Sequence, residues 1–211
     1  MIDSGFFITS FVALFVIIDP IGLTPIFIAL TQGLPTKQQR RIALRAIAVA
    51  GGLLAVFAVL GEAVLEFIGI SMPAFRVAGG ILLFLTALDM LFERRTKRRE
   101  ERSQPEEEEE DIEDPSVFPM AIPLIAGPGS ITTVILLTGE HSGFVGFAAT
   151  MGVVAAVLLI LLGLCFSAGA LAQALGKTGV TVVTRLLGML LAALAVQFVL
   201  DGLRDFGLMG S

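Results

Sequence analysis

The distribution of apolar residues is the feature of this sequence that most constrains its fold. Six runs are long enough to cross a bilayer, whose hydrocarbon core takes about 20 mostly apolar residues in helical form. They lie at about 5–31, 42–66, 73–93, 116–138, 143–172 and 180–203. Charged residues make up only 16% of the chain, and sixteen of the 33 fall between Arg94 and Asp114. The sequence therefore predicts an all-α transmembrane protein with six spans.

The loops between these spans differ in their content of Lys and Arg. The first loop carries Lys37, Arg40 and Arg41, the third carries six basic residues, and the fifth carries Lys177. The second and fourth loops carry none. Because basic residues accumulate in cytoplasmic loops, we expect loops one, three and five in the cytoplasm and both termini outside.

Two stretches of the first half of the chain recur in the second half. Residues 19–24 (DPIGLT) correspond to 127–132 (GPGSIT), and residues 76–82 (RVAGGIL) correspond to 185–191 (RLLGMLL). The spacing from the proline of the first stretch to the arginine of the second is 56 residues in the first half and 57 in the second. Two separate matches at nearly the same spacing indicate an internal repeat.

This repeat predicts the domain organisation. We expect a first three-helix repeat at 1–93, a disordered acidic cytoplasmic linker at 94–115 and a second three-helix repeat at 116–211. The composition of the linker cannot support a packed core. Because each repeat has an odd number of spans, the second enters the membrane from the opposite side, as in the inverted repeats of many secondary transporters.

Spans one and four are each interrupted near their midpoints. The interruptions are Asp19-Pro20-Ile21-Gly22 and Gly127-Pro128-Gly129. Proline removes a backbone N–H and clashes with the preceding turn, and glycine lets the chain leave helical geometry. Paired interruptions in two halves are typical of a transporter binding site, although two kinks used only for packing are the alternative. We predict two discontinuous helices that face each other at mid-membrane.

The ends of these half-helices indicate what such a site binds. The half-helices that begin near Ile21 and Ser130 direct partial positive charge and unpaired N–H groups at the midplane, which suits a carboxylate. Those that end near Ile18 and Ala126 present carbonyl groups, which suit an ammonium group or a small cation. One cavity with poles of both signs fits a small zwitterionic solute.

Asp19 is a carboxylate near the bilayer centre, which is costly and indicates a function. It either binds the substrate amine or a coupling ion, Na⁺ or H⁺, or it caps the second half-helix, and both roles are compatible. Hydroxyl groups nearby add candidate ligands. The predicted substrate-binding set is Asp19, Pro20, Ile21, Gly22, Thr24, Gly127, Pro128, Gly129, Ser130, Thr132 and Thr133.

Arg76 and Arg185 lie about one turn inside spans three and six. They either extend to the membrane interface or form gating ion pairs, with Glu62 or Glu66 as partners of Arg76. The chain shows no nucleophile–base pair and no cluster of metal ligands, so we expect no enzyme, cofactor or metal site. It also lacks a basic patch interleaved with aromatic residues, so we expect no nucleic-acid partner. His141 is predicted to be a solvated loop residue.

Three stretches together resemble the MarC family of prokaryotic inner-membrane proteins. They are DPIGLTPIFIAL (19–30), GISMPAFRVAGGILLFLTALDML (69–91) and PLIAGPGSITTVI (123–135). The commonest form of the first motif in that family has Asn where this chain has Asp19. The resemblance implies membership of the lysine-exporter superfamily, a plasma-membrane location in a prokaryote, and transport of small neutral amino acids such as glycine or alanine. Export of metabolites or drugs and a membrane scaffold without transport are the alternatives.

Overall fold

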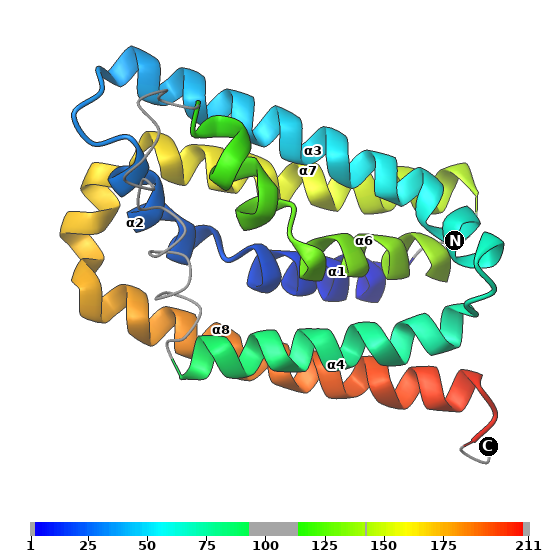
Figure 1. The fold of residues 1–211 in the computed structure, drawn as a ribbon. Helices are drawn as coiled ribbons and strands as arrows, with labels where there is room; N and C mark the ends of the chain where they lie inside the picture. The colour runs from blue at the N-terminus through cyan, green and yellow to red at the C-terminus, as the bar shows by residue number, and fades with distance from the viewer. Residues whose placement is uncertain (1–2, 93–113, 142, 209–211) are drawn as a thin grey trace, which may run out of the picture.

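The structure is a computed structural model that describes residues 3–92, 114–141 and 143–208. In these residues all regular structure is helical (Figure 1). The elements are α1 (Ser4–Ile18), α2 (Pro20–Leu30), α3 (Thr36–Phe67), α4 (Met72–Leu91), η1 (Ser116–Ile125), α6 (Pro128–Glu140), α7 (Phe144–Phe166) and α8 (Ala168–Asp205). Most of the predicted linker, 94–113, lies outside the described residues.

The apolar runs of the sequence coincide with these helices. Five stretches are long and apolar enough to cross a membrane: Ser4–Leu30, Thr36–Phe67, Met72–Leu91, Phe144–Phe166 and Thr178–Asp205. The pair η1 and α6 makes a sixth if it is counted as one bent span. Many large apolar side chains face outward, with Phe67 90% exposed, as the surface of a helix bundle in lipid requires. In the part of the chain that the structure describes, an all-helical fold with five to six candidate membrane spans is thereby confirmed.

The segments that contain the predicted interruptions lie in the interior of the bundle. About 61% of the most apolar window of Ser4–Leu30 is buried, against 28–39% for the other four candidate spans. In α6, four successive residues from Val134 to Leu137 are also buried. The helices α3, α4, α7 and α8 surround this central layer (Figure 1). The two segments with the strongest functional signals are therefore the two that the rest of the chain encloses.

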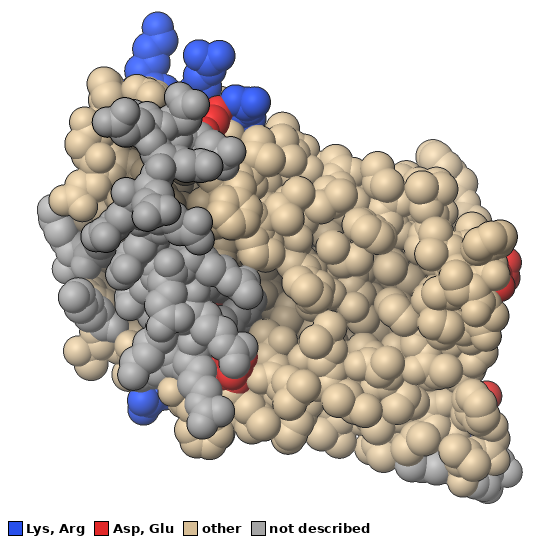
Figure 2. All heavy atoms as spheres, in the orientation of Figure 1, with Lys and Arg blue, Asp and Glu red and all other residues tan. Residues whose placement is uncertain are grey.

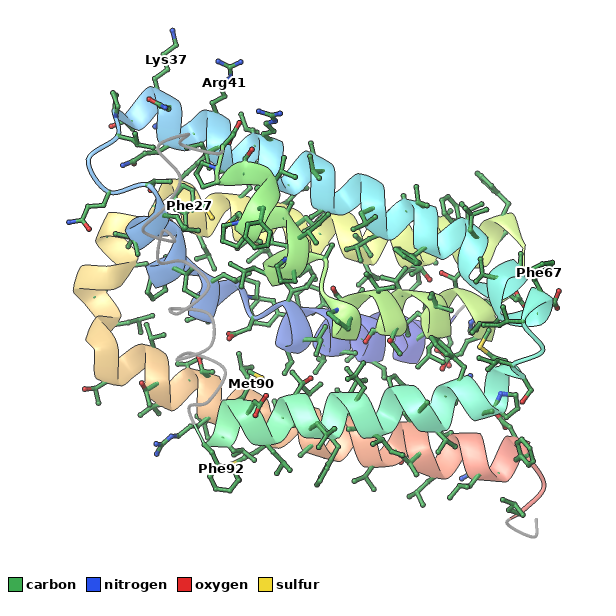
Figure 3. The ribbon with its side chains drawn as sticks, in the orientation of Figure 1. Phe27, Lys37, Arg41, Phe67, Met90 and Phe92 are labelled. Atoms are coloured by element: carbon green, nitrogen blue, oxygen red, sulfur yellow. The ribbon has the colours of Figure 1, made fainter. Side chains whose placement is uncertain are left out.

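The two ends of the bundle differ in charge. The described chain begins and ends at one end of the bundle, and α3 begins at the other (Figure 1). Lys and Arg side chains gather around the start of α3 on the visible face (Figure 2), where Lys37 and Arg41 project outward, whereas Phe67 lies at the opposite end (Figure 3). We refer to these as the basic end and the terminal end.

The start of the second half of the chain is held at the basic end by Asp114. Its carboxylate accepts a hydrogen bond from the backbone N–H of Ser116 at 3.0 Å and forms an ion pair with Arg45 of α3. Hydrogen bonding from Ser116, together with the positive charge of Arg45, holds the pKa of Asp114 below its usual value. These contacts join the start of η1 to α3 at the basic end.

After non-helical backbone at Gly176, the rest of α8 packs against α4 in antiparallel orientation (Figure 1). A Cβ atom added at Gly80 would lie 2.8 Å from the carbonyl oxygen of Ala195, and one added at Gly202 would lie 3.0 Å from that of Pro73. Both distances are tighter than ordinary contacts, so glycine is what allows the two backbones to approach. The pair forms one closely packed unit.

Gly80→Ala should destabilise the protein by about 1–3 kcal/mol, because the new methyl group would press on the backbone of α8. Gly52→Ala is the matched control, since Gly52 is exposed inside α3 with no atom within 4 Å of the new Cβ. It should leave stability unchanged or raise it by up to about 1 kcal/mol through helix propensity. Thermal unfolding in detergent measures both, and equal effects would contradict the packing described here.

Candidate functional site

The first interruption is at Asp19, between α1 and α2. The residue has φ of 56° and ψ of 65°, the left-handed conformation that Asp tolerates better than most residues. Its N–H closes α1 on the carbonyl of Phe15 at 2.9 Å, and its carboxylate accepts from the N–H of Gly22 at 3.1 Å. A Cβ at Gly22 would overlap that carboxylate. Asp19 therefore caps α2, and it is only 1% exposed.

The second interruption is at Gly127, between η1 and α6, whose axes are bent by 57°. Here the hydroxyl oxygen of Ser130 accepts from the N–H of Gly127 at 3.0 Å and donates to the carbonyl of Ile125 at 2.8 Å. A Cβ at Gly127 would lie 2.5 Å from the carbonyl oxygen of Pro123, so this position also requires glycine. Ser130 thus joins the two sides of the bend.

The segment before this bend departs from the regular half-helix that the sequence predicts. Phe118 and Ile122 have extended φ and ψ angles inside η1, and both precede proline residues. Proline disfavours helical geometry in the residue before it and removes an N–H from the helix. The helical end expected near Ala126 is consequently a set of irregular turns that ends at Ile125.

The two interruptions are closed in complementary ways. A capping box has two hydrogen bonds. In the first, the side chain of the residue before the helix accepts from the backbone N–H of the third helical residue; in the second, the return bond, the side chain of that third residue accepts from the backbone N–H of the residue before the helix. The first interruption has only the first of these bonds, from Gly22 to Asp19, and the second has only the return bond, from Gly127 to Ser130. In the repeat alignment Asp19 corresponds to Gly127 and Gly22 to Ser130. One copy is therefore closed by a carboxylate and the other by a neutral hydroxyl.

The two interruptions are packed against each other. A Cβ at Gly129, two residues after the second interruption, would lie 2.7 Å from Cδ1 of Ile17, two residues before the first. Helix α4 adjoins the same place, because a Cβ at Gly79 would lie 2.5 Å from Cγ2 of Thr132 and Leu83 is near Gly129. Residues from both halves of the chain thus meet in the interior.

The predicted substrate-binding residues divide by exposure and by hydrogen bonding. Two threonine hydroxyls donate within their own helices, from Thr24 to the carbonyl of Pro20 at 2.9 Å and from Thr133 to that of Gly129 at 2.8 Å. The hydroxyl oxygens of Thr24 and Thr133 can still accept hydrogen bonds. Asp19, Pro20, Thr24, Ser130, Thr132 and Thr133 are buried, Ile21, Gly22, Gly127 and Gly129 are half-buried, and Pro128 is exposed.

The predicted gating residues lie away from the two interruptions and away from one another. Arg76 pairs with Asp205 at 2.7 Å and with Glu140 at 3.5 Å. The expected pairing with Glu62 or Glu66 is wrong, because both lie on the exposed side of α3.

Arg185 belongs to the other end of the α4–α8 pair. A Cβ at Gly188, one turn further along α8, would lie 2.9 Å from Cβ of Met90 near the end of α4, whereas Arg76 is near its start. The two equivalent arginines of the repeat therefore lie at opposite ends of the bundle.

The environment of His141 also differs from the expectation of a solvated loop residue. Its ring packs edge-on against Phe6 of α1, with ring centroids 4.8 Å apart, and its Nδ1 atom is buried. The loop after α6 folds back onto the start of α1, a contact that the local sequence does not reveal. Glu140 and Asp205, the actual partners of Arg76, were missed for the same reason, since both come from distant parts of the chain.

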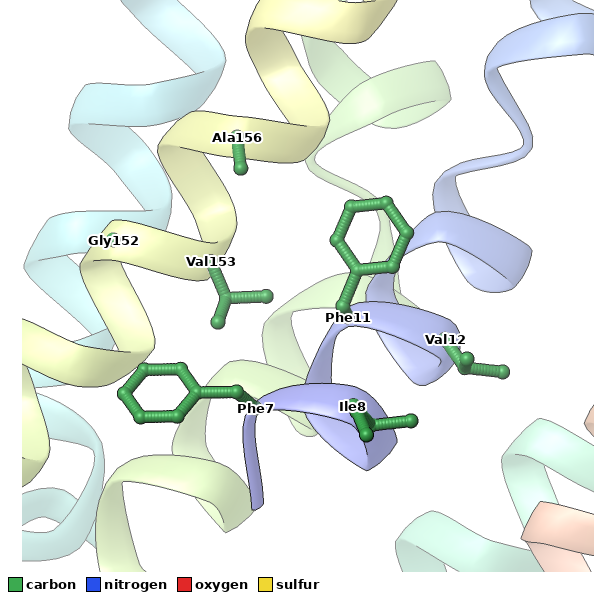
Figure 4. Close-up of a pocket in the computed structure, with 7 residues that line it drawn as sticks. All are labelled: Phe7, Ile8, Phe11, Val12, Gly152, Val153 and Ala156. Atoms are coloured by element: carbon green, nitrogen blue, oxygen red, sulfur yellow. The ribbon is translucent and has the colours of Figure 1, made fainter. Parts of the chain in front are cut away.

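An open groove of about 500 Å³ lies between α1 and α7, away from the interruptions. Phe7, Phe11 and Val153 line the space between the two helices (Figure 4), together with Ile8, Val12, Gly152 and Ala156. The lining is apolar and includes none of the predicted site residues. Among the described residues no group of three or more His, Cys, Asp or Glu is arranged to hold a metal ion.

Ser130→Ala should destabilise the protein by about 1–3 kcal/mol, because it leaves the N–H of Gly127 and the carbonyl of Ile125 without their partner inside the bundle. Ser167→Ala is the control, since its hydroxyl makes a comparable bond to the carbonyl of Gly163 at an exposed position. That change should cost less than about 0.5 kcal/mol. Thermal unfolding compares the two, and an equally small loss at Ser130 would show that its hydroxyl does not hold the bend.

Comparison with known proteins agrees with this architecture. The model of the MarC family of integral membrane proteins matches residues 4–206. The chain is 35% identical over 206 residues to the UPF0056 membrane protein MJ1677 of Methanocaldococcus jannaschii, covering 96% of this chain and 98% of the relative. It is 38% identical over 201 residues to the UPF0056 membrane protein YvbG of Bacillus subtilis, covering 95% of each. No solved structure matches. A family match over nearly the whole chain and relatives of the same length lead to one conclusion: the chain belongs to the MarC family of integral membrane proteins.

Proposed function

We propose that this protein is a secondary transporter of small neutral amino acids, zwitterions such as glycine and alanine, and that it works by alternating access between two inverted repeats. One observation carries the proposal. Two helix interruptions at equivalent positions of a repeated sequence are packed against each other in the interior, through Ile17 and Gly129. Irregular backbone inside a membrane bundle is tolerated where protein buries it or where it lines a cavity.

The arrangement of the repeats supports this mechanism. Helices α4 and α8, the third spans of the two repeats, run antiparallel (Figure 1), and the equivalent residues Arg76 and Arg185 lie at opposite ends. In an inverted repeat, equivalent helices run in opposite directions and equivalent residues lie at opposite ends of the bundle. We take α1 with α2 and η1 with α6 as the two broken spans. Exchanging the conformations of the two repeats would then expose the same site first to one side and then to the other.

The recognition chemistry follows from the helix ends at the interruptions. Helices α2 and α6 begin at Pro20 and Pro128, and the N–H groups of a first helical turn have no acceptor within the helix. These ends carry partial positive charge, so they suit the carboxylate of an amino acid. The carboxylate of Asp19 suits the ammonium group. A zwitterion satisfies both without adding net charge to the interior.

Close packing around the interruptions favours the smallest substrates. The contacts of Gly129 with Ile17 and of Gly79 with Thr132 leave no space for even an added methyl group in the conformation described here. A site that forms when these surfaces separate slightly would admit glycine or alanine before a large side chain. The apolar groove between α1 and α7 is the observation that favours the second candidate, export of a lipophilic drug or metabolite.

The direct test is uptake of labelled glycine, alanine and serine into proteoliposomes that contain the purified protein. We expect saturable uptake that depends on a Na⁺ or pH gradient, with protein-free liposomes as the control and leucine and lysine as competitors. Glycine and alanine should compete well and the larger amino acids poorly. Absence of amino-acid uptake by correctly folded protein would contradict the proposal and leave an exporter of other solutes or a membrane scaffold.

Asp19→Asn tests the ionic role of the buried carboxylate. Asn also caps helices well, so the fold should persist, whereas the dependence of transport on Na⁺ or pH should disappear. The transport rate should fall by about tenfold or more, since a bond to a charged group is worth about 1.5–3 kcal/mol. Asp201→Asn is the control, because Asp201 bonds to Gln197 and Arg204 on the surface of α8. Unchanged transport and ion dependence would leave Asp19 with the capping role alone.

We also propose that the basic end faces the cytoplasm of a prokaryotic cell, with both termini outside. Cysteine accessibility tests this in a Cys165→Ala background. Phe67→Cys at the terminal end should react with a membrane-impermeant maleimide on intact cells, and Lys37→Cys at the basic end should react only after the cells are broken. The reverse pattern would invert the assignment.

A further inference from the structure

Arg76 connects three helices at the terminal end. It lies near the start of α4, Glu140 is the last residue of α6, and Asp205 is the last residue of α8. Its guanidinium contacts Asp205 through Nη1 at 2.7 Å and Glu140 through Nη2 at 3.5 Å. The Arg76 side chain is 13% exposed, whereas those of Glu140 and Asp205 are 31% and 45% exposed. A nearly buried cation is thus held by two more exposed carboxylates.

The two ion pairs differ in what they join. Arg76 and Asp205 belong to α4 and α8, which are locked together along their length by the close backbone contacts at Gly80 and Gly202. The Arg76–Asp205 pair therefore lies within one packed unit. Glu140 belongs to α6, so the Arg76–Glu140 pair crosses from that unit to another helix.

Helix α6 connects this cluster to the candidate site. Its 13 residues run from Pro128 at the second interruption to Glu140, a rise of about 18 Å along the axis. Between these ends, two of its contacts with α4 place a glycine opposite a side chain. A Cβ at Gly79 would meet Thr132 and Leu136, and one at Gly139 would meet Met72. These contacts are made with side-chain atoms only, whereas Gly80 and Gly202 also approach backbone atoms of the neighbouring helix, so α6 can separate from α4 more easily than α8 can.

We propose that the Arg76–Glu140 ion pair is the gate on the terminal side of the site, and that it breaks when α6 separates from the α4–α8 unit while Arg76 stays bound to Asp205. This gate rests on the proposed transport function. Removing one partner of a buried ion pair is costly because it leaves an unpaired charge. When Glu140 moves away from Arg76, Asp205 still neutralises the guanidinium through the shorter contact, so no unpaired charge is left.

Other charged groups at this end do not make the same connection. Arg204 pairs with Asp201 at 3.6 Å within α8, and His141 packs on Phe6 next to Glu140. Glu140 is the only charged residue of α6, so its pair with Arg76 is the one that links α6 to the α4–α8 unit by charge. The proposal therefore assigns different roles to two carboxylates on the same arginine.

The test uses a buried reporter cysteine between the gate and the site. Leu136→Cys in a Cys165→Ala background suits this purpose, because Leu136 is fully buried one turn before Glu140 and faces Gly79. The full chain is reconstituted in nanodiscs, where both ends are accessible, and reacted with a charged maleimide. Glu140→Gln should raise the labelling rate about fivefold, the shift expected from losing about 1 kcal/mol of ion pairing. Asp205→Asn, the matched change on the same arginine, should lower the labelling rate or leave it unchanged, because opening would then leave Arg76 without a carboxylate partner.

The two carboxylates must behave differently for the gate to stand. Equal labelling in Glu140→Gln and Asp205→Asn, or no change in either, would overturn it. If Leu136→Cys does not fold, Met72→Cys reports on the same interface from the α4 side, where Met72 faces Gly139. Labelling needs no substrate, so the two proposals fail separately. Transport with equal labelling overturns the gate alone, and selective labelling without amino-acid transport overturns the proposed substrate but keeps a gate.

Discussion

Every peptide group in the middle of an apolar bundle needs a hydrogen-bond partner, because neither lipid nor aliphatic side chains can supply one. Two segments of this chain leave helical geometry there. The peptide groups there are accommodated because each interruption is enclosed by other helices and closed by one polar side chain, Asp19 in the first and Ser130 in the second. The central position of both segments follows from the same requirement.

The difference between these two closures makes the two halves of the chain unequal. Asp19 places an ionisable group at the first interruption, whereas Ser130 closes the second interruption without charge. In the transport mechanism proposed here, only the first interruption can bind a coupling ion or the amine of the substrate electrostatically. In the same proposed mechanism the α4–α8 unit is the fixed side of the site, and α6, whose contacts at Gly79 and Gly139 are with side-chain atoms only, is the side that moves.

The sequence predicts the helices well and the contacts between them poorly. Long apolar runs bounded by polar clusters are a local signal, so the spans lie close to the observed helices, and Pro20 and Pro128 mark the places where helices begin. The irregular turns of η1 also have a local cause, in Pro119 and Pro123, which hydropathy alone does not reveal. The linker lies almost wholly outside the described residues and stays a prediction.

Contacts between distant segments have no such local signal. Arg76 could be expected to pair, but its partners come from positions 140 and 205, and sequence proximity pointed instead to Glu62 and Glu66. The packing of His141 on Phe6 and the contact of Ile17 with Gly129 depend in the same way on how α1, α4 and α6 come together. The predicted binding set contains residues of both interruptions and stays a prediction, whereas the hydrogen bonds of Ser130, Thr24 and Thr133 within their own segments required coordinates.

The central claim is that the two interruptions adjoin each other inside the membrane and bind a solute between them. Disulfide or short bis-maleimide cross-linking of the Ile17→Cys, Gly129→Cys double variant in membranes, in a Cys165→Ala background, tests it most directly. The change at position 17 removes the atoms that a side chain at position 129 would meet. We predict rapid cross-linking that glycine or alanine slows. Failure of the pair to cross-link, in protein whose single variants fold normally, would show that the interruptions do not meet and would contradict the account.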